Sequence, residues 1–421
     1  MKRELAIKIG IVALAIAVRL GLIYYFLVVH PTNIVSDGIE YLLIARGFEL
    51  GEPYLLGYLI ARPPLFPLVV FGVRSLFGDA PVYVAIANTL FSSLTCVVGY
   101  DLAKRFSGDI RVPLLTALIL ALDPTLAVVA AFVQAEPLAN LLLGLSLLSL
   151  ARLVQERQPA EALWAGLWLA LSALARPTSL YFAAAAVAIF ILLLPRATWW
   201  RYFIIFAILP VAAGFGWTWR NYQTAGVFTY ASVADFNMLY YRAVAVEHWA
   251  TGEDPDAIRQ RYAWEVEQRV ESGVPREKID SGYFWINFAP QDQRRLTAMR
   301  DIAIKVYLAY PFWYVATIPI GLYNMLATSM ELPVWRPVEI GLNVVFYLFA
   351  LRGLWLAWRA GRRDLAIISL TTILYFIAAT LASQTTGMST RMRSPFTILL
   401  AVLAAEGIVA PLALRSRRAS Q

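Results

Sequence analysis

The sequence predicts an all-α protein that crosses a membrane about ten times. Of its 421 residues, 60% are hydrophobic and only 15% are charged, whereas a soluble domain carries roughly 25% charged residues. The mean hydropathy is +0.63. Many apolar runs have the length of about 17 to 25 residues that a helix needs to cross a bilayer. These observations exclude a soluble globular domain.

Basic residues set the expected topology, because they gather in cytoplasmic loops. This rule places both termini in the cytoplasm and residues 30–80 and 220–336 outside. We divide the chain into a core at 1–219 that includes the first outer loop, a large outer loop at 220–336, and C-terminal helices at 337–421. The ten expected spans are 5–29, 81–102, 112–131, 138–154, 162–176, 178–195, 202–219, 337–358, 365–382 and 395–413.

Two further apolar segments are expected to lie at the outer surface rather than cross. Residues 64–77 are short and interrupted by Arg74, which suits an interfacial helix. Residues 306–328 are long enough to span, but a crossing there would put the basic loop 359–363 outside. We therefore expect this segment to be interfacial or re-entrant. In the polar part of the loop, Asp254 precedes Pro255 and starts a helix to about Val270.

Composition also excludes several kinds of function. The net charge of +8 arises mostly from cytoplasmic loops, so it gives no reason to expect nucleic-acid binding. Cys96 is the single cysteine, which rules out an intrachain disulfide or a cysteine metal cluster. With only His30 and His248 present, a histidine-rich metal site is not expected. No glycine-rich phosphate loop and no internal repeat are found.

Three acids at the outer surface are candidates for catalysis. Asp37 and Glu40 are three residues apart, so on a helix they share a face with Tyr41. A carboxylate there can act as general base toward an acceptor hydroxyl, or both acids can be solvated surface groups. Glu136 lies in a short outer turn, as a second active-site acid or as the partner of an arginine. Asp123 is a weaker candidate.

Arginines at the same surface are candidates for binding a phosphate, because the guanidinium fork matches phosphate oxygens. Several of them break the distribution that the positive-inside rule predicts, which indicates a positive rim around an anionic ligand. For Arg62 the alternative is contact with lipid headgroups, and Arg19, inside the first span, needs a partner. The candidates are Arg62, Arg176, Arg220, Arg391 and Arg393, with Tyr41, Asn221 and Tyr222 in support.

Together these pieces resemble the GT-C membrane glycosyltransferases, in particular the protein O-mannosyltransferases and lipid A aminoarabinose transferases. The resemblance extends over nearly the whole chain, in the order of its motifs. They are Ser36-Asp37 with Tyr41, Arg62-Pro63-Pro64, Asp123-Pro124 with Glu136, Arg176-Pro177, Trp219-Arg220-Asn221-Tyr222, and Arg391-Met392-Arg393-Ser394-Pro395. One departure is that Gly38 follows Asp37, where mannosyltransferases of the family often have Glu.

The resemblance implies an inverting transfer of a sugar from a polyisoprenyl phosphate to a hydroxyl at the non-cytoplasmic face of the plasma (inner) membrane. Asp37 would be the general base, and the arginines would hold the donor phosphate. The acceptor classes that stay open are lipid, glycan and protein. No cofactor is obligatory in this scheme, although Asp37, Glu40 and Glu136 could converge on a divalent metal.

Two other classes of function compete with this interpretation. A transporter or flippase of an anionic lipid or sugar phosphate would use the same arginines, but it should also show repeats and charges inside the spans. Arg19 is the one such charge. A non-catalytic scaffold or lipid-binding subunit would be indifferent to the loss of Asp37.

Overall fold

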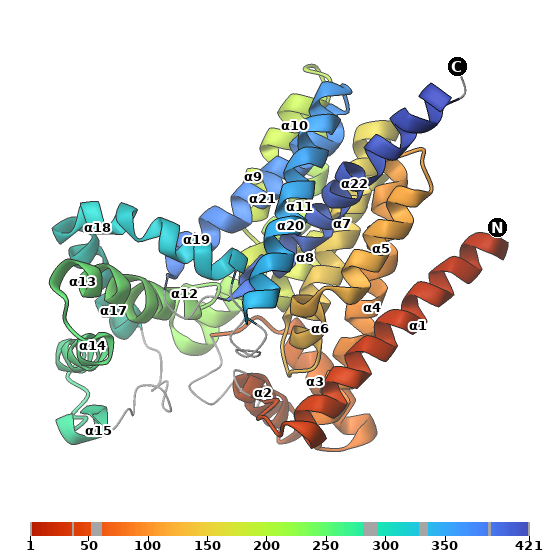
Figure 1. Ribbon diagram of the computed structural model, residues 1–421. Coiled ribbons are helices and arrows are strands. Elements are labelled where there is room, and N and C mark those ends of the chain that lie inside the picture. Colours follow the sequence, from red (N-terminus) through yellow and green to blue (C-terminus); the bar gives the residue numbers. More distant parts are fainter. Residues whose placement is uncertain are drawn as a thin grey trace.

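A computed structural model of the chain describes residues 2–35, 38–51, 61–280, 293–327, 336–385 and 389–419. Over these residues the regular elements are all helices, and most of them run side by side in one bundle (Figure 1). The described C-terminal end lies at the top of this view, and the surface helices α2 (Ile39–Glu49) and α3 (Leu65–Phe77) lie at the bottom. The predicted all-α membrane fold is confirmed.

Seven helices of the described part are long and apolar enough to cross a membrane, judged by length and composition. An eighth span results if the bent pair α5 and α6 counts as one. Helices also cover the expected spans at 162–176 and 178–195, but these are shorter, so the count of ten is not confirmed. The seven are α1 with η1 (Lys2–Val29), α4 (Pro81–Phe106), α7 (Glu136–Glu156), α11 (Trp199–Ala225), α20 (Arg336–Arg359), α21 (Arg363–Ser383) and the span Thr390–Val409, which consists of η6 (Thr390–Phe396) and the first part of α22 (Thr397–Ala419). The shorter ones are α8 (Pro159–Ala175) and the stretch of η3 (Pro177–Ser179), α9 (Phe182–Ala185) and α10 (Val187–Leu193).

The break between α5 (Arg111–Leu122) and α6 (Pro124–Ala130) turns the chain by 50°. Pro124 has no N–H group to continue the helix, so the last carbonyls of α5 lose their helical partners. The buried Arg19 of α1 donates to two of them, the carbonyl oxygens of Leu120 at 3.2 Å and Ala121 at 3.1 Å. In lipid every backbone polar group must be satisfied within the protein. Arg19 therefore stabilises this break. The partners that the sequence predicts for Arg19 include these backbone carbonyls.

The loops at one end of the bundle carry the basic clusters. Lys104 at the end of α4 pairs with Glu4 of α1 at 2.8 Å, and Arg362 donates to the carbonyl oxygen of Phe106 at 3.2 Å. Arg105 pairs with Glu156 at the end of α7. These contacts bring the N-terminal end and three basic loops together, as the positive-inside rule requires of one membrane face.

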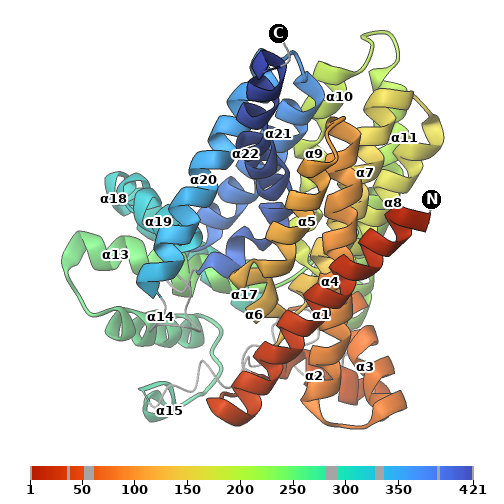
Figure 2. The ribbon, with the colours of Figure 1, turned by 45° about the vertical axis from the view of Figure 1, so that its right-hand side comes forward.

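The first outer loop packs against the opposite end of the bundle. Arg74 of α3 makes a two-point ion pair with Glu49 of α2, with N–O distances of 2.7 and 3.2 Å. The rings of Tyr41 and Phe66 meet edge to face at 4.8 Å between centroids. These contacts fix α2 and α3 to each other (Figure 2 shows them together below α4).

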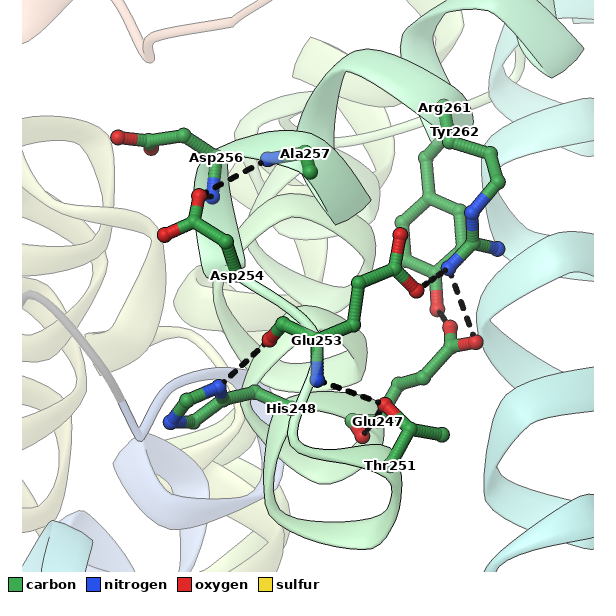
Figure 3. Close-up of polar contacts among 9 residues, drawn as sticks. All are labelled: Glu247, His248, Thr251, Glu253, Asp254, Asp256, Ala257, Arg261 and Tyr262. Carbon is green, nitrogen blue, oxygen red and sulfur yellow. Dashed lines mark hydrogen bonds and ion pairs between the residues drawn. The ribbon is translucent and has the colours of Figure 1, made fainter.

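The large outer loop forms a group of short helices with a hydrophobic core of its own, beside the bundle (Figure 1). Asp254 starts α14 as predicted, because its carboxylate accepts from the N–H groups of Asp256 at 2.9 Å and Ala257 at 3.2 Å (Figure 3). Over residues 306–327 the described chain is broken into short helices, so no continuous span forms there. The elements are α12 (Val233–Asn237), η4 (Met238–Ala243), α13 (Val244–Thr251), α14 (Pro255–Arg269), α15 (Arg276–Asp280), α17 (Gln293–Ala309), α18 (Pro311–Ala316) and α19 (Ile318–Ala327).

Candidate active site

Glu136 lies between two arginines that come from distant parts of the sequence. Its Oε1 atom is 2.8 Å from Nη1 of Arg176 and 2.5 Å from Nε of Arg391. The side chain of Glu136 is 2% exposed, whereas those of the two arginines are 14% and 18% exposed. A carboxylate buried this deeply is tolerated because it is paired on both sides. The arginines are the more accessible partners.

Local chain geometry aims these three side chains at one another. Glu136 opens α7 just before Pro137, where a proline fits the first helical turn and a negative charge is favoured. Arg176 ends α8 in an extended conformation, with φ −142° and ψ 123°. The next residue is Pro177, which disfavours helical geometry in the residue before it. Arg391 lies in the 3₁₀ helix η6, whose start is capped by Ser389.

A second ion pair lies within the first outer loop, beside this site. Nε of Arg62 donates to Oε2 of Glu40 at 2.6 Å, and the Arg62 guanidinium lies 5.4 Å from the centre of the Tyr41 ring. Burial raises the pKa of the Tyr41 hydroxyl, and the charges of Arg62, Glu136, Glu40 and Arg391 also act on it. Tyr41 thus stands among both ion-paired groups, as a neutral phenol.

We call Glu40, Arg62, Glu136, Arg176 and Arg391 the acid–arginine cluster. Three guanidiniums and two carboxylates leave an excess of one positive charge, 3 − 2 = +1. The cluster contains three of the five arginines predicted to hold a phosphate and two of the three predicted catalytic acids. An excess of positive charge held in a partly buried site suits a phosphate group.

Asp37 lies outside the described residues, but its neighbour Gly38 explains the departure from the family pattern. A Cβ atom at position 38 would lie 2.3 Å from the carbonyl oxygen of Val133. The N–H of Val133 in turn donates to the carbonyl oxygen of Ile34 at 3.0 Å. The first outer loop therefore packs backbone to backbone on the turn that precedes Glu136, and no larger residue than glycine fits at position 38.

Arg393 is not part of the cluster. It is fully buried, and its Nη2 donates to Asp123 at 2.9 Å and to Thr125 at 3.1 Å. Asp123 also caps α6 by accepting from the N–H of Leu126 at 2.8 Å. This ion pair joins η6 to the break between α5 and α6, so the contacts of Arg393 and Asp123 are structural ones.

Arg220, Asn221 and Tyr222 form contacts within their own region. Arg220 donates to the side-chain oxygen of Asn221 at 3.1 Å and lies 5.0 Å from the centre of the Trp217 ring. The buried Asn221 amide donates to the carbonyl oxygen of Thr229 at 2.9 Å, which holds the turn after α11. Tyr222 is 47% exposed. None of these contacts reaches the acid–arginine cluster.

Sequence reasoning missed Arg242, an arginine of the outer loop that is fully buried in the structure. It lies in the π-helical turn η4, in an otherwise apolar and aromatic run of the sequence. π-helical turns are rare and often occur at functional sites. Since such a turn leaves no clear sequence signal, a single arginine in an apolar run was the only available sign. As for metals, no group of three His, Cys, Asp or Glu converges within the described ranges, which do not include Asp37.

Comparisons with known proteins agree with this architecture. Residues 61–219 match a family described as dolichyl-phosphate-mannose-protein mannosyltransferase. The range includes Arg62, Glu136 and Arg176, but not Arg391. No curated protein sequence shows a detectable match.

Among solved structures, the archaeal oligosaccharyltransferase AglB from Archaeoglobus fulgidus, in complex with an inhibitory peptide and a dolichol-phosphate, is similar with a TM-score of 0.55. The identity is 13%, over 98% of this chain and 52% of that chain. The apo form of the Archaeoglobus fulgidus enzyme gives a TM-score of 0.56 at 12% identity, over 97% of this chain and 51% of that one. The chain has a GT-C fold.

The GT-C fold predicted from the motifs is thereby confirmed, and the chain spans about half the length of these oligosaccharyltransferases. A third similarity is to ArnT from Cupriavidus metallidurans bound to undecaprenyl phosphate, with 13% identity over 88% of this chain and 73% of that one. Its TM-score is 0.42. Within the GT-C fold, the acid–arginine cluster lies where the first outer loop, α7, α8 and η6 meet.

Proposed function

We propose that the chain is an inverting glycosyltransferase that moves a sugar from a polyisoprenyl phosphate to an acceptor hydroxyl at the non-cytoplasmic membrane face. The observation that carries the proposal is the acid–arginine cluster, which gathers three guanidiniums around one membrane-end site on a GT-C fold. Its end of the bundle is opposite the basic loops around Lys104 and Arg362. Because basic loops face the cytoplasm, the position of the cluster at the other end of the bundle supports a site that faces outward.

The chemistry needs stabilisation of the departing phosphate. As the glycosidic bond breaks, the leaving phosphate gains negative charge, and fixed donors in a partly buried site stabilise that charge. Arg176 and Arg391 are held by Glu136, which orients their guanidiniums and balances part of their charge. In this scheme Glu136 is a positioning residue rather than a proton acceptor. Arg62, fixed by Glu40, supplies the third guanidinium.

Asp37 is the proposed general base. It would accept the proton of the acceptor hydroxyl while the hydroxyl oxygen attacks the anomeric carbon from the face opposite the phosphate, which inverts that centre. Gly38 packs closely on Val133, and Val133 is only three residues before Glu136 in sequence. The backbone at Gly38 therefore lies near the start of α7. The polyisoprenyl tail of the donor would lie in the bilayer beside the helices. The acceptor is a lipid, a glycan or a protein.

The test is transfer of labelled sugar from synthetic polyprenyl-phosphate donors by purified protein, wild type against Asp37→Asn. The account predicts turnover by wild type and retained donor binding with at least a hundredfold lower turnover in Asp37→Asn. The matched control is Asp256→Asn, an exposed carboxylate of the outer loop, which should behave as wild type.

Two other results would change the account. Donors that bind to both forms without turnover in either would favour the transporter or flippase. Equal turnover in wild type and Asp37→Asn would keep the enzyme and remove Asp37 from its chemistry. Arg19 was the one sequence feature in favour of a transporter. In the structure it donates to the carbonyl oxygens of Leu120 and Ala121 at the α5–α6 break, so its burial has a structural reason.

A further inference from the structure

Arg242 occupies an enclosed position where the outer loop meets the helix bundle. Its Nη1 donates to the hydroxyl of Thr317 at 3.0 Å and to the hydroxyl of Thr385, at the end of α21. Its Nη2 donates to the carbonyl oxygen of Tyr314, and the guanidinium lies 4.3 Å from the centre of the Tyr314 ring. The site therefore joins η4, the α18–α19 segment and α21.

All of these partners are neutral. Within the described ranges no carboxylate lies within ion-pair distance of Arg242, and its Nε has no acceptor. A buried charge without a counter-charge costs several kcal/mol, so buried arginines are normally paired with an acid. The arginines of the acid–arginine cluster and Arg393 follow that rule.

The other buried arginine without an acid, Arg19, is a different case. All three of its nitrogens donate to acceptors, among them the carbonyls of Leu120 and Ala121. Those carbonyls end a helix and carry partial negative charge. Arg242 has hydroxyls and a single carbonyl instead, and its Nε–H has no protein acceptor in the described part of the chain.

A second donor lies beside Arg242. The Thr317 hydroxyl accepts a hydrogen bond from Arg242 and donates one to the carbonyl oxygen of Trp313 at 2.8 Å. The Thr385 hydroxyl also accepts from Arg242, and among the described residues it has no acceptor for its own proton. The Nε–H of Arg242 and the O–H of Thr385 are thus two donors next to a positive charge. N–H and O–H donors beside a positive charge are the kind of groups that bind phosphate oxygens.

We propose that Arg242 and Thr385 form an anion site, separate from the acid–arginine cluster, that binds a phosphate group. The phosphate can belong to a lipid headgroup or be free in solution, because the same donors serve both. Binding supplies the counter-charge that the described part of the chain does not provide. The proposal concerns binding alone, so it stands or falls independently of sugar transfer.

The test measures the shift in Tm of the full-length protein in nanodiscs on titration with farnesyl phosphate, inorganic phosphate or farnesol. Wild type should be stabilised by at least one of the phosphate probes and not by farnesol. A response to both marks a general phosphate site, and a response to farnesyl phosphate alone marks a lipid headgroup site. In Arg242→Gln the apparent affinity for the responding probe should fall at least about tenfold, as expected when a charge-assisted contact is lost.

The control is Arg300→Gln, which removes a half-exposed arginine of the same loop and should leave the response unchanged. Thr385→Val serves as a second variant if Arg242→Gln does not fold, and it should weaken the response severalfold. The proposal is overturned if wild type responds to neither phosphate probe, or if both site variants respond as wild type does. If only Arg391→Gln loses the response, the phosphate binds at the acid–arginine cluster, which contradicts this proposal and supports the proposed function.

Discussion

Arg391 donates from Nε to Oε1 of Glu136 at 2.5 Å, across a separation of 255 residues in sequence. The contact joins the start of α7 to the last helical segment of the chain, and Arg176 completes it from the end of α8. These three helical segments are thereby held together at one point. The pair is both an anchor of the fold at this end and the centre of the proposed site.

Glu136→Gln should therefore lower the free energy of unfolding by about 3 kcal/mol, because it leaves two partly buried guanidiniums without their shared anion. Reversible unfolding in mixed detergent measures the change. Glu156→Gln removes one partner of an exposed ion pair at the opposite end and should cost less than about 1 kcal/mol. A similar cost for the two variants would show that Glu136 does not anchor the cluster.

Gly38→Ala should disturb the site through the backbone. The new Cβ atom would lie 2.3 Å from the Val133 carbonyl oxygen, so the first outer loop or the turn before Glu136 must shift. We expect turnover to fall at least about tenfold, since small displacements of catalytic groups are costly. Gly72→Ala is the matched control, because a Cβ there meets no atom within 4 Å. Wild-type turnover in Gly38→Ala is the contradicting outcome.

Arg19→Met should destabilise the protein by about 2 to 4 kcal/mol. The substitution keeps an apolar chain of similar length but leaves the carbonyls of Leu120 and Ala121 unsatisfied in the bundle. Unfolding measured beside Arg3→Met, an exposed control on the same helix, checks the effect. A loss no larger than that of the control would mean that the break at Pro124 does not need Arg19.

The topology can be tested with cysteines, because the only native one, Cys96, is buried. Asp256→Cys lies in the large outer loop and Arg196→Cys in a basic loop of the opposite end. In intact cells a membrane-impermeant maleimide should label the first variant and not the second, and both should react after the membrane is opened. The reverse pattern would invert the orientation and place the site in the cytoplasm.

The sequence predicted the helices well, because long apolar runs and their loop charges are set locally. It also predicted Asp254 as a helix start, since capping depends on adjacent residues. The number of spans was less secure. The segments after Pro159 and Pro177 are apolar but short, and length alone does not decide whether such a helix crosses.

Which of the candidate residues lie together in space was harder to predict than the helices that carry them. Arg391 and Arg393 are two residues apart, and in a 3₁₀ helix with three residues per turn they point in different directions. One therefore meets Glu136 and the other Asp123. Sequence spacing does not reveal this choice, because it depends on which helices pack beside η6. The same holds for Arg242, whose hydrogen-bond partners come from two segments distant in sequence.

The most direct test of the central claim is the turnover of a labelled polyprenyl-phosphate sugar by purified wild type and Arg391→Lys. Lysine keeps the positive charge but loses the fork that contacts Glu136 and the proposed phosphate. The account predicts that wild type transfers the sugar, even slowly to water, and that Arg391→Lys lowers kcat at least about a hundredfold, the loss expected for one transition-state donor. Equal kcat in the two forms would contradict the assignment of the acid–arginine cluster as the site of transfer.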